Sequence, residues 1–264
     1  MNKWQKRLYS RYGSWAVVTG ASSGIGHAMA LRLAEAKLNL VLVARSQHVL
    51  EQMATDLGDR YGIDTRVVRL DLAEETGVDT LATITQDLDV GLLVAAAGFG
   101  TSGLFLDSQL DQELEMLNVN CRALLALSWY FGQRCAKRGR GGLVLMSSIV
   151  GFQGMPFAAH YAATKAYVQT LAEALAVELT PMGVDVIASA PGPTNSGFGA
   201  RAGMKMGKVL HPEDVAQATL DTLGRKSLVL PGLLTKVLVY SLVPLPRWAR
   251  VRIMGRVMHS MTHA

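Results

Sequence analysis

The sequence predicts a single-domain α/β fold in which helices cover both faces of a doubly wound parallel sheet. Apolar runs typical of buried strands alternate with helical runs along the chain, the order that a parallel sheet requires. A glycine-rich turn joins the first of these strands to a helix. The chain has 264 residues, of which 50% are hydrophobic, so it can build one large core.

Each expected strand is a run of aliphatic and β-branched residues that ends in turn residues. These runs cover residues 15–19, 38–44, 65–70, 90–95, 142–146, 183–188 and 227–231. The expected helices show apolar residues at helical spacing, and they cover residues 1–12, 25–35, 110–137, 161–178, 211–223, 233–243 and 247–261.

The turn after the first expected strand has the sequence TGASSGIG, from Thr19 to Gly26. Gly20 can adopt backbone angles that are closed to other residues, and Gly24 and Gly26 let phosphates and the strand approach the helix start closely. Backbone N–H groups and the helix dipole there favour a pyrophosphate. The turn therefore predicts a Rossmann-type dinucleotide site that includes Gly20, Ser22, Ser23, Gly24, Ile25 and Gly26.

Tyr161 and Lys165 are four residues apart in an expected helix, so they lie one turn apart on the same face. A nearby ammonium favours phenolate, and it typically lowers the pKa of an acid by about 1–3 pH units. The spacing thus predicts a Tyr161 pKa lowered from about 10 toward neutrality, where acid–base catalysis is efficient. Ser148 follows the strand expected over residues 142–146, and its hydroxyl can hold a carbonyl that the phenol protonates. Such spacing alone also occurs by chance.

These motifs, with Pro191-Gly192 after a later strand, resemble the short-chain dehydrogenase/reductase family in its short single-domain subgroup. The motif order matches over residues 14–195. The resemblance implies that Asn120, Ser148, Tyr161 and Lys165 are catalytic, and that Asn120 holds a water linking Lys165 to bulk solvent. A surface or core-capping role for Asn120 is the alternative.

The resemblance also implies further cofactor contacts, made by Asp71, Leu72, Ala97, Gly98, Tyr161, Lys165, Pro191, Gly192 and Thr194. Asp71 would border the adenine, although it is equally an ordinary helix N-cap. The family usually has asparagines where this chain has Ala95 and Ala96, which leaves the rigidity of the central sheet open. No metal is expected.

Arg45 follows the second expected strand, where many NAD-binding folds carry an acid for the ribose hydroxyls. An arginine suits a 2′-phosphate instead, and a charge-assisted hydrogen bond is worth about 1.5–3 kcal/mol. This predicts a preference for NADP over NAD of about 10- to 100-fold. A solvated arginine at the head of the next helix is the alternative.

The two cysteines, Cys121 and Cys135, lie about 21 Å apart on one expected helix, beyond disulfide reach. Free thiols indicate a reducing cytoplasm. Residues 1–12 have no apolar core and are not a secretory signal. No apolar run reaches the about 20 residues that a membrane-spanning helix needs.

The net charge of +5 comes from the two ends of the chain, because residues 1–12 and 232–264 are basic and hold no acid. A basic patch confined to the ends argues against a nucleic-acid binder. We therefore divide the chain into a basic N-terminal extension (1–12), a dinucleotide-binding and catalytic domain (13–231) and an apolar, basic C-terminal extension (232–264).

Both extensions carry an apolar helical face. In the first it consists of Trp4, Leu8 and Tyr12, and in the last of Trp248, Val251, Met254, Val257, Met258 and Met261. We expect packing on the body or on a partner subunit, with contact to an anionic membrane surface as the alternative. The glycine-rich segment 195–209, with Phe198, Met204 and Met206, fits a loop that orders over a substrate. Arg201, Lys205 and Lys208 in it are expected to be solvated, an anionic acyl carrier being the alternative partner.

The sequence predicts an NADP-dependent oxidoreductase that interconverts a carbonyl and an alcohol by hydride transfer. The two ends of the chain resemble reductases that act on long-chain acyl or steroid-like carbonyls, which implies an apolar small-molecule substrate. The family resemblance implies a dimer or tetramer. Two rivals remain: a non-catalytic NADP-binding regulatory protein on the same fold, and a membrane-surface scaffold.

Overall fold

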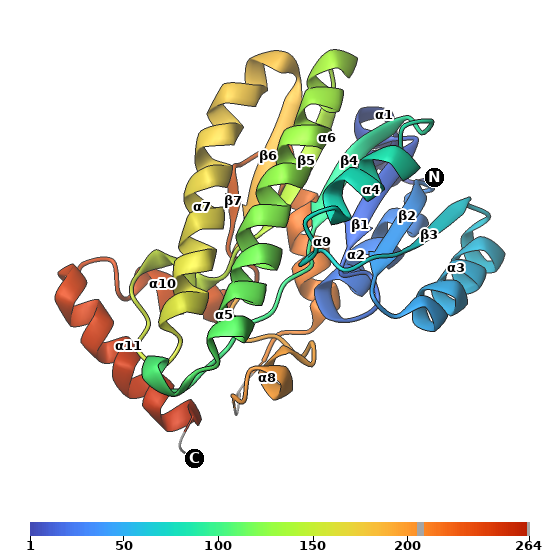
Figure 1. Ribbon diagram of the computed structural model, residues 1–264. Coiled ribbons are helices and arrows are strands. Elements are labelled where there is room, and N and C mark those ends of the chain that lie inside the picture. Colours follow the sequence, from blue (N-terminus) through green and yellow to red (C-terminus); the bar gives the residue numbers. More distant parts are fainter. Residues whose placement is uncertain (205–208, 263–264) are drawn as a thin grey trace.

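A parallel sheet forms the centre of the computed structural model, which describes residues 1–204 and 209–262 (Figure 1). In this part of the chain the sheet has seven strands in the order β3-β2-β1-β4-β5-β6-β7, all parallel to their neighbours. They are β1 (Trp15–Thr19), β2 (Asn39–Ala44), β3 (Thr65–Arg69), β4 (Val90–Ala95), β5 (Gly141–Met146), β6 (Val184–Ser189) and β7 (Leu228–Val229). The strand order reverses between β1 and β4, which confirms the predicted doubly wound fold.

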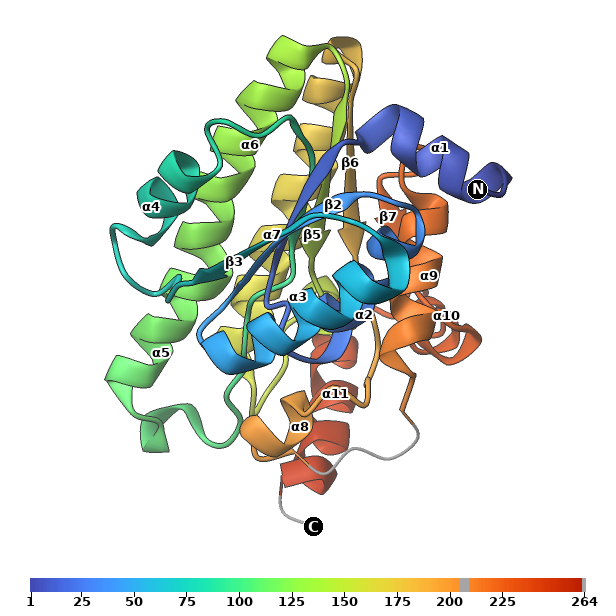
Figure 2. The same cartoon turned by 90° about the vertical axis from the view of Figure 1, so that its right-hand side faces the viewer.

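Two layers of helices enclose the sheet, because its strands are apolar on both faces (Figure 2). One face is covered by α2 (Gly24–Glu35), α3 (Gln47–Tyr61) and α9 (Pro212–Thr222). The other is covered by α4 (Gly77–Ile84), α6 (Leu124–Arg138) and α7 (Ala159–Leu179). Strand residues alternate between the two cores, so Val18 packs with the first layer and Val17 with the second.

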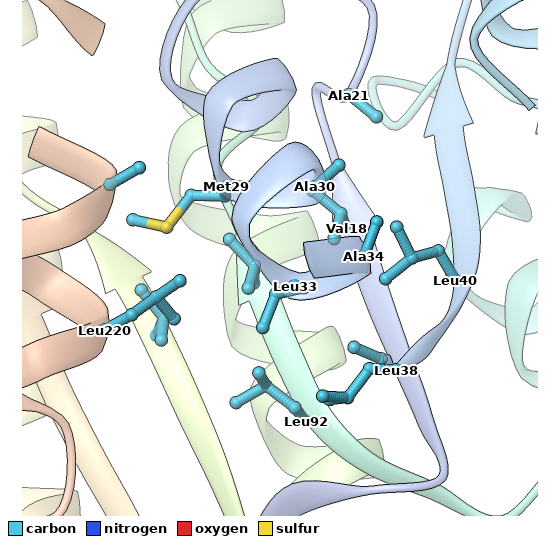
Figure 3. Packing of buried hydrophobic residues seen from close by; sticks show 14 of the residues in the cluster. Val18, Ala21, Met29, Ala30, Leu33, Ala34, Leu38, Leu40, Leu92 and Leu220 are labelled. Atoms are coloured by element: carbon cyan, nitrogen blue, oxygen red, sulfur yellow. The ribbon is translucent and has the colours of Figure 1, made fainter. Parts of the chain in front are cut away.

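The position of α2 is set by close packing on the sheet. Met29 and Leu33 of α2 are fully buried between the sheet and Leu220 of α9 (Figure 3). Ala30 and Ala34 face the strands, and their small side chains let the helix lie close to them (Figure 3). This packing holds the N-terminus of α2 directly above the end of β1.

The helix predicted over residues 110–137 is interrupted. It consists of α5 (Leu110–Leu117), a π-helical segment at Asn118–Ala123, and α6. The predicted helical run is therefore present, with a π-helical centre that the sequence did not predict. A π-bulge inserts an extra residue into a helix and is frequent at functional sites. Here it contains Asn120, a predicted catalytic residue.

The N-terminal helix α1 (Lys3–Tyr12) packs on the body of the molecule, with Leu8 and Tyr12 fully buried. The Tyr12 hydroxyl donates to Asp185 of β6 at 2.6 Å, and Arg11 forms an ion pair with the same carboxylate. Arg7 donates to the carbonyls of Leu220 and Leu223 at the end of α9. The apolar face of α1 thus belongs to the core and is not exposed to a membrane.

The C-terminal helices α10 (Leu233–Tyr240) and α11 (Arg247–Thr262) lie at the carboxyl ends of the strands, with α11 below α7 in Figure 1. Met254, Met258 and Met261 of α11 join a small core that includes Tyr161. Short turns complete the chain at Phe105–Asp107, Ile149–Phe152, Thr180–Met182 and α8 (Phe198–Arg201). None of the helices described here is long and apolar enough to cross a membrane.

Candidate active site

The glycine turn lies at the carboxyl end of β1 and leads directly into α2. Gly20 and Gly24 have φ angles of 68° and 55°, in the left-handed region that favours glycine. A Cβ at Gly26 would lie 2.3 Å from the carbonyl oxygen of Gly20, so no side chain fits there. The turn therefore brings the N–H groups at the start of α2 to the point where the strand order reverses, the usual place for a pyrophosphate.

The segment after β4 lies beside this turn and is held by Thr19. The Thr19 hydroxyl accepts hydrogen bonds from the backbone N–H groups of Ala96 and Ala97, both at 3.1 Å. It also lies 3.4 Å from the carbonyl oxygen of Val94 as a donor. Although Ala95 and Ala96 replace the family's asparagines, the Thr19 side chain joins β1 to β4 at this end of the sheet.

Arg45 stands at the end of β2, facing two carboxylates. Its guanidinium lies 3.6 Å from Asp71 and 3.5 Å from Glu115, and its side chain is half exposed. Asp71 also accepts from the backbone N–H of Ala73 at 2.9 Å, so it caps a turn as well as bordering this region. Arg201 of α8 lies 3.9 Å from Glu115. Sequence reasoning missed Glu115, because only the fold brings α5 to the end of β2.

Ser148, Tyr161 and Lys165 meet beside the carboxyl end of β5. Lys165 is buried on α7 and donates to the carbonyl oxygen of Met146, the last residue of β5, at 2.8 Å. The Ser147 hydroxyl in turn donates to the carbonyl oxygen of Lys165 at 2.9 Å. These two bonds attach the first turns of α7 to the end of β5 and so fix Tyr161 next to Ser148.

The prediction that Lys165 lowers the pKa of Tyr161 was wrong for this arrangement. Burial raises the pKa of Tyr161 to about 12, although its hydrogen bond with Ser148 acts in the opposite direction. The Lys165 ammonium lies 5.8 Å from the centre of the Tyr161 ring. Burial also lowers the pKa of Lys165 to about 8. The phenol is therefore protonated at neutral pH, because the effect of desolvation exceeds that of the hydrogen bond with Ser148.

Asn120 lies behind the site, next to Phe99. Its side-chain amide donates to the Phe99 carbonyl at 2.9 Å and to the Thr164 hydroxyl at 3.0 Å, and its oxygen accepts from the Phe99 N–H at 3.2 Å. A Cβ at Gly98 would lie 2.8 Å from that oxygen and 3.5 Å from Lys165 Nζ. Asn120 thus holds the segment after β4 against α7; its predicted part in a proton relay stays a prediction.

The segment after β6 covers the site from the other side. The Thr194 hydroxyl donates to the carbonyl of Gly192, whose N–H donates to Thr235 of α10 at 3.3 Å. Further on, the rings of Phe198 and Tyr161 are 5.1 Å apart. Met204 packs in the same apolar cluster, in agreement with a loop that covers the site. Lys205, Met206, Gly207 and Lys208 lie outside the described residues.

One cavity of about 960 Å³ joins the glycine turn, Arg45 and the Ser148–Tyr161–Lys165 group, whereas Asn120 does not line it. Every predicted cofactor residue lines it, namely Gly20, Ser22, Ser23, Gly24, Ile25, Gly26, Arg45, Asp71, Leu72, Ala97, Gly98, Tyr161, Lys165, Pro191, Gly192 and Thr194, as does Ser148. Gly20 and Gly26 have no space for a side chain, because backbone atoms occupy their Cβ positions. This turn at the N-terminus of α2 fits the phosphate chain of a dinucleotide, and Arg45 fits a 2′-phosphate.

The other end of the cavity is apolar and uses residues that the sequence did not assign to it. Its lining includes Phe99, Met155, Leu242, Met254 and Met258. The apolar face of residues 247–261 was expected to cover the body, a partner or a membrane; most of it closes the cavity above Tyr161. An amphipathic pattern shows which side of a helix is buried, but it does not show what that side packs against. The sequence alone therefore did not indicate that these residues line the cavity.

Comparison with known proteins supports the family resemblance seen in the sequence. A model of the short chain dehydrogenase family matches residues 14–206. The chain is 31% identical to a 7beta-hydroxysteroid dehydrogenase from Clostridium sardiniense over 86% of this chain and 88% of the relative. A solved 7beta-hydroxysteroid dehydrogenase superimposes with a TM-score of 0.86 at 27% identity, covering 94% of this chain and 98% of that one.

A short-chain dehydrogenase from Sphingobium yanoikuyae, solved in complex with NADPH, superimposes with a TM-score of 0.81 at 29% identity, covering 92% of this chain and 95% of that one. The family match and these relatives identify the chain, with its Rossmann-type sheet and its cavity at the carboxyl edge, as an oxidoreductase. Within that class, the chain belongs to the short-chain dehydrogenase family.

Proposed function

We propose that this protein is an NADP-dependent oxidoreductase that interconverts a carbonyl and an alcohol on a bulky apolar substrate. The observation that carries the proposal is a continuous cavity that runs from the glycine turn past Tyr161 to an apolar end at α11. Small-molecule sites are mostly apolar with few convergent polar groups, and here those groups are Ser148 and Tyr161.

Tyr161 is the acid–base group of the proposed reaction. Its raised pKa keeps the phenol protonated near pH 7, ready to give its proton to the oxygen of a carbonyl that is being reduced. Ser148 holds that oxygen and polarises the carbonyl. The nicotinamide, when bound, supplies or accepts the hydride. Lys165 is buried beside the cofactor end of the site, where its ammonium would hold the nicotinamide ribose, and Asn120 would carry the proton relay.

NADP is the proposed cofactor because Arg45 is the cation at the end of β2. Residues 44–46 contain no acid that would favour NAD. The related dehydrogenase from Sphingobium yanoikuyae was solved with NADPH. The carboxylates of Asp71 and Glu115 near Arg45 pre-orient its guanidinium, and a 2′-phosphate would compete with them for it.

A polycyclic or long-chain carbonyl compound is the proposed substrate. The apolar end of the cavity is lined by several methionines, whose flexible side chains adapt to irregular shapes. Relatives of this chain include 7beta-hydroxysteroid dehydrogenases, which supports a steroid-like ring system. We further propose that the protein is cytoplasmic, consistent with two free, buried thiols at Cys121 and Cys135. We also propose that it is a homo-oligomer.

The test compares wild type with Tyr161→Phe. Wild type should oxidise NADPH with at least one bulky ketone from a panel of steroid and long-chain carbonyls. Tyr161→Phe should still bind NADPH, measured by calorimetry, while kcat/KM falls by about 10²- to 10⁴-fold. Ser128→Ala, a buried hydroxyl on α6 away from the cavity, is the matched control.

Two results would favour the rivals. Tight NADPH binding without turnover of any carbonyl would favour a non-catalytic NADP-binding protein. Equal rates for wild type and Tyr161→Phe would remove the phenol from the mechanism.

A further inference from the structure

Four charged side chains from four different elements line the cavity at the end of β2. Arg45 follows β2, Asp71 follows β3, Glu115 lies on α5 and Arg201 lies on α8. Two of them are cations and two are anions, so their arrangement decides which charge this part of the cavity binds. The proposed reaction gives no part to Arg201, although its side chain lies in the wall of the cavity.

Arg45 and Arg201 share one carboxylate oxygen. Oε1 of Glu115 lies 3.5 Å from Nη1 of Arg45 and 3.9 Å from Nη2 of Arg201. Both distances exceed the about 2.7–2.9 Å of a tight charge-assisted hydrogen bond. A guanidinium has five N–H donors, so this loose bridge leaves both groups able to donate to a stronger anion. The carboxylate of Glu115 thus marks a place between two cations that an anion can occupy.

The guanidinium of Arg201 is held close to this place. It lies 4.1 Å from the centre of the Phe99 ring, a distance that suits a cation–π contact. Partial burial lowers the pKa of Arg201, and the charge of Arg45 acts in the same direction. Two cations on one side of a cavity repel each other, and an anion with two negative charges would relieve that repulsion better than one carboxylate does.

We propose that Arg201 is a second ligand of the 2′-phosphate of NADP, which it binds together with Arg45 in place of Glu115. This inference rests on the proposed NADP cofactor. A phosphate presents more acceptor oxygens than a carboxylate and suits the planar fork of an arginine. Glu115 then competes with the phosphate: it lies between the two arginines when no phosphate is bound. Its side chain is 37% exposed, so it can turn into solvent when the phosphate arrives.

The phosphate contact would also act on the substrate end of the cavity. Arg201 belongs to α8, and Phe198 of the same helix lies 5.1 Å from the ring of Tyr161. Just beyond α8, the carbonyl of Ala202 accepts from the Ser102 hydroxyl at 2.5 Å. A phosphate bound to Arg201 would therefore help to hold α8 over the substrate, in the manner of a closing loop. NAD lacks this phosphate, so the KM for the substrate should be lower with NADPH than with NADH.

The experiment measures Kd by calorimetry for NADP and for NAD with wild type, Arg201→Met and Glu115→Gln. For Arg201→Met we expect the Kd for NADP to rise by about 10-fold, because a charge-assisted contact is lost. For Glu115→Gln we expect the Kd for NADP to fall by about 3- to 10-fold, because the competing charge is removed. The Kd for NAD should change by less than about twofold in both variants.

The opposite directions separate this role from a structural one. If the ion pair only stabilised the fold, breaking it from either side would weaken both cofactors. The matched controls are Arg225→Met and Glu178→Gln, which change exposed residues that do not line the cavity and should leave both Kd values unchanged. A second measurement is the KM for a bulky ketone at saturating cofactor: Arg201→Met should raise it with NADPH and leave it unchanged with NADH.

The outcomes also separate this inference from the proposed function. A wild type that binds no NADP would overturn the proposed cofactor and this inference with it. NADP binding that Arg201→Met leaves at the wild-type Kd, or equal weakening of NADP and NAD, would overturn the role of Arg201 alone. Weaker NADP binding by Glu115→Gln would show that Glu115 supports the site and does not compete with the phosphate.

Discussion

The side chain of Asn120 forms hydrogen bonds with both the N–H and the carbonyl of Phe99, as a neighbouring strand would. It can do so because Asn120 lies in the π-helical segment between α5 and α6, which turns its side chain toward the sheet. Phe99 follows directly after the segment that Thr19 holds beside the glycine turn. Asn120 therefore joins α7, through Thr164, to the backbone at the cofactor end of the cavity.

Replacing Asn120 by Ala should destabilise the protein. The change leaves the buried N–H and carbonyl of Phe99 without partners, and each unsatisfied group costs about 1–3 kcal/mol. We expect the free energy of unfolding to fall by about 2–4 kcal/mol in urea titrations followed by circular dichroism. Asn118→Ala is the control: it lies in the same π-helical segment, and within the described part of the chain its side chain accepts one hydrogen bond, from the partly buried Arg122. A loss as large for Asn118→Ala would attribute the effect to the helix and not to Phe99.

The parts of the site that sequence could predict are those set by local spacing. The Gly20–Gly26 turn, the Tyr161–Lys165 pair and Arg45 at the end of β2 depend on neighbouring residues and on the order of strands, and all of them line the one cavity. The strands and most helices were predicted for the same reason, since the apolar period within each segment defines it.

The features that the sequence could not predict depend on how deeply a side chain is buried and on contacts between residues far apart in the sequence. The pKa of Tyr161 is set by how completely α7 is covered, and part of that cover is α11, about a hundred residues further along the chain. The π-helical segment at Asn118–Ala123 adds one residue within a continuous helical run, a change too small for the spacing of apolar residues to reveal. Glu115 reaches Arg45 only because α5 lies beside the end of β2.

Lys165→Met should stabilise the fold while removing activity. Burial lowers the pKa of Lys165 from 10.5 to about 8. The amine binds a proton more readily in the unfolded chain than in the folded one. Below pH 8 the buried charge therefore lowers the free energy of unfolding of wild type, and this loss decreases as the pH rises toward 10.5. After allowing for the lost hydrogen bond to Met146, we expect the variant to be more stable by about 2 kcal/mol at pH 7.

The pH dependence separates this effect from better packing. Urea titrations at pH 7 and at pH 9.5 should give a smaller advantage for Lys165→Met at the higher pH, because the wild-type ammonium is then largely neutral. Lys226→Met, at an exposed lysine before β7, should leave stability unchanged at both pH values. A Lys165→Met variant less stable than wild type at pH 7 would contradict the prediction.

Arg45→Ser should lower the preference for NADP. Loss of the guanidinium removes a charge-assisted contact worth about 1.5–3 kcal/mol, and it leaves Asp71 and Glu115 as uncompensated negative charges near a 2′-phosphate. We expect the Kd for NADP to rise by about 10- to 100-fold and the Kd for NAD to change by less than about threefold, measured by calorimetry. Arg69→Ser, at the exposed end of β3, provides the control, since Arg69 does not line the cavity. Equal weakening of both cofactors would assign Arg45 to a structural role.

Met258→Trp should restrict the enzyme to small substrates. Met258 is 4% exposed and packs in the cluster that contains Tyr161, at the apolar end of the cavity. A larger side chain there would fill space for the substrate and leave the glycine turn and Arg45 untouched, so NADPH binding should stay within about twofold of wild type. For a polycyclic ketone we expect kcat/KM to fall by at least about 10-fold, which is the effect of losing one or two methylene-sized contacts in an apolar pocket. A small ketone should retain its rate.

The control is Ser260→Trp, which adds the same bulk at an exposed position on the same helix. If Met258→Trp left the polycyclic ketone unaffected, α11 would not border the bound substrate, and the apolar end of the cavity would need another explanation.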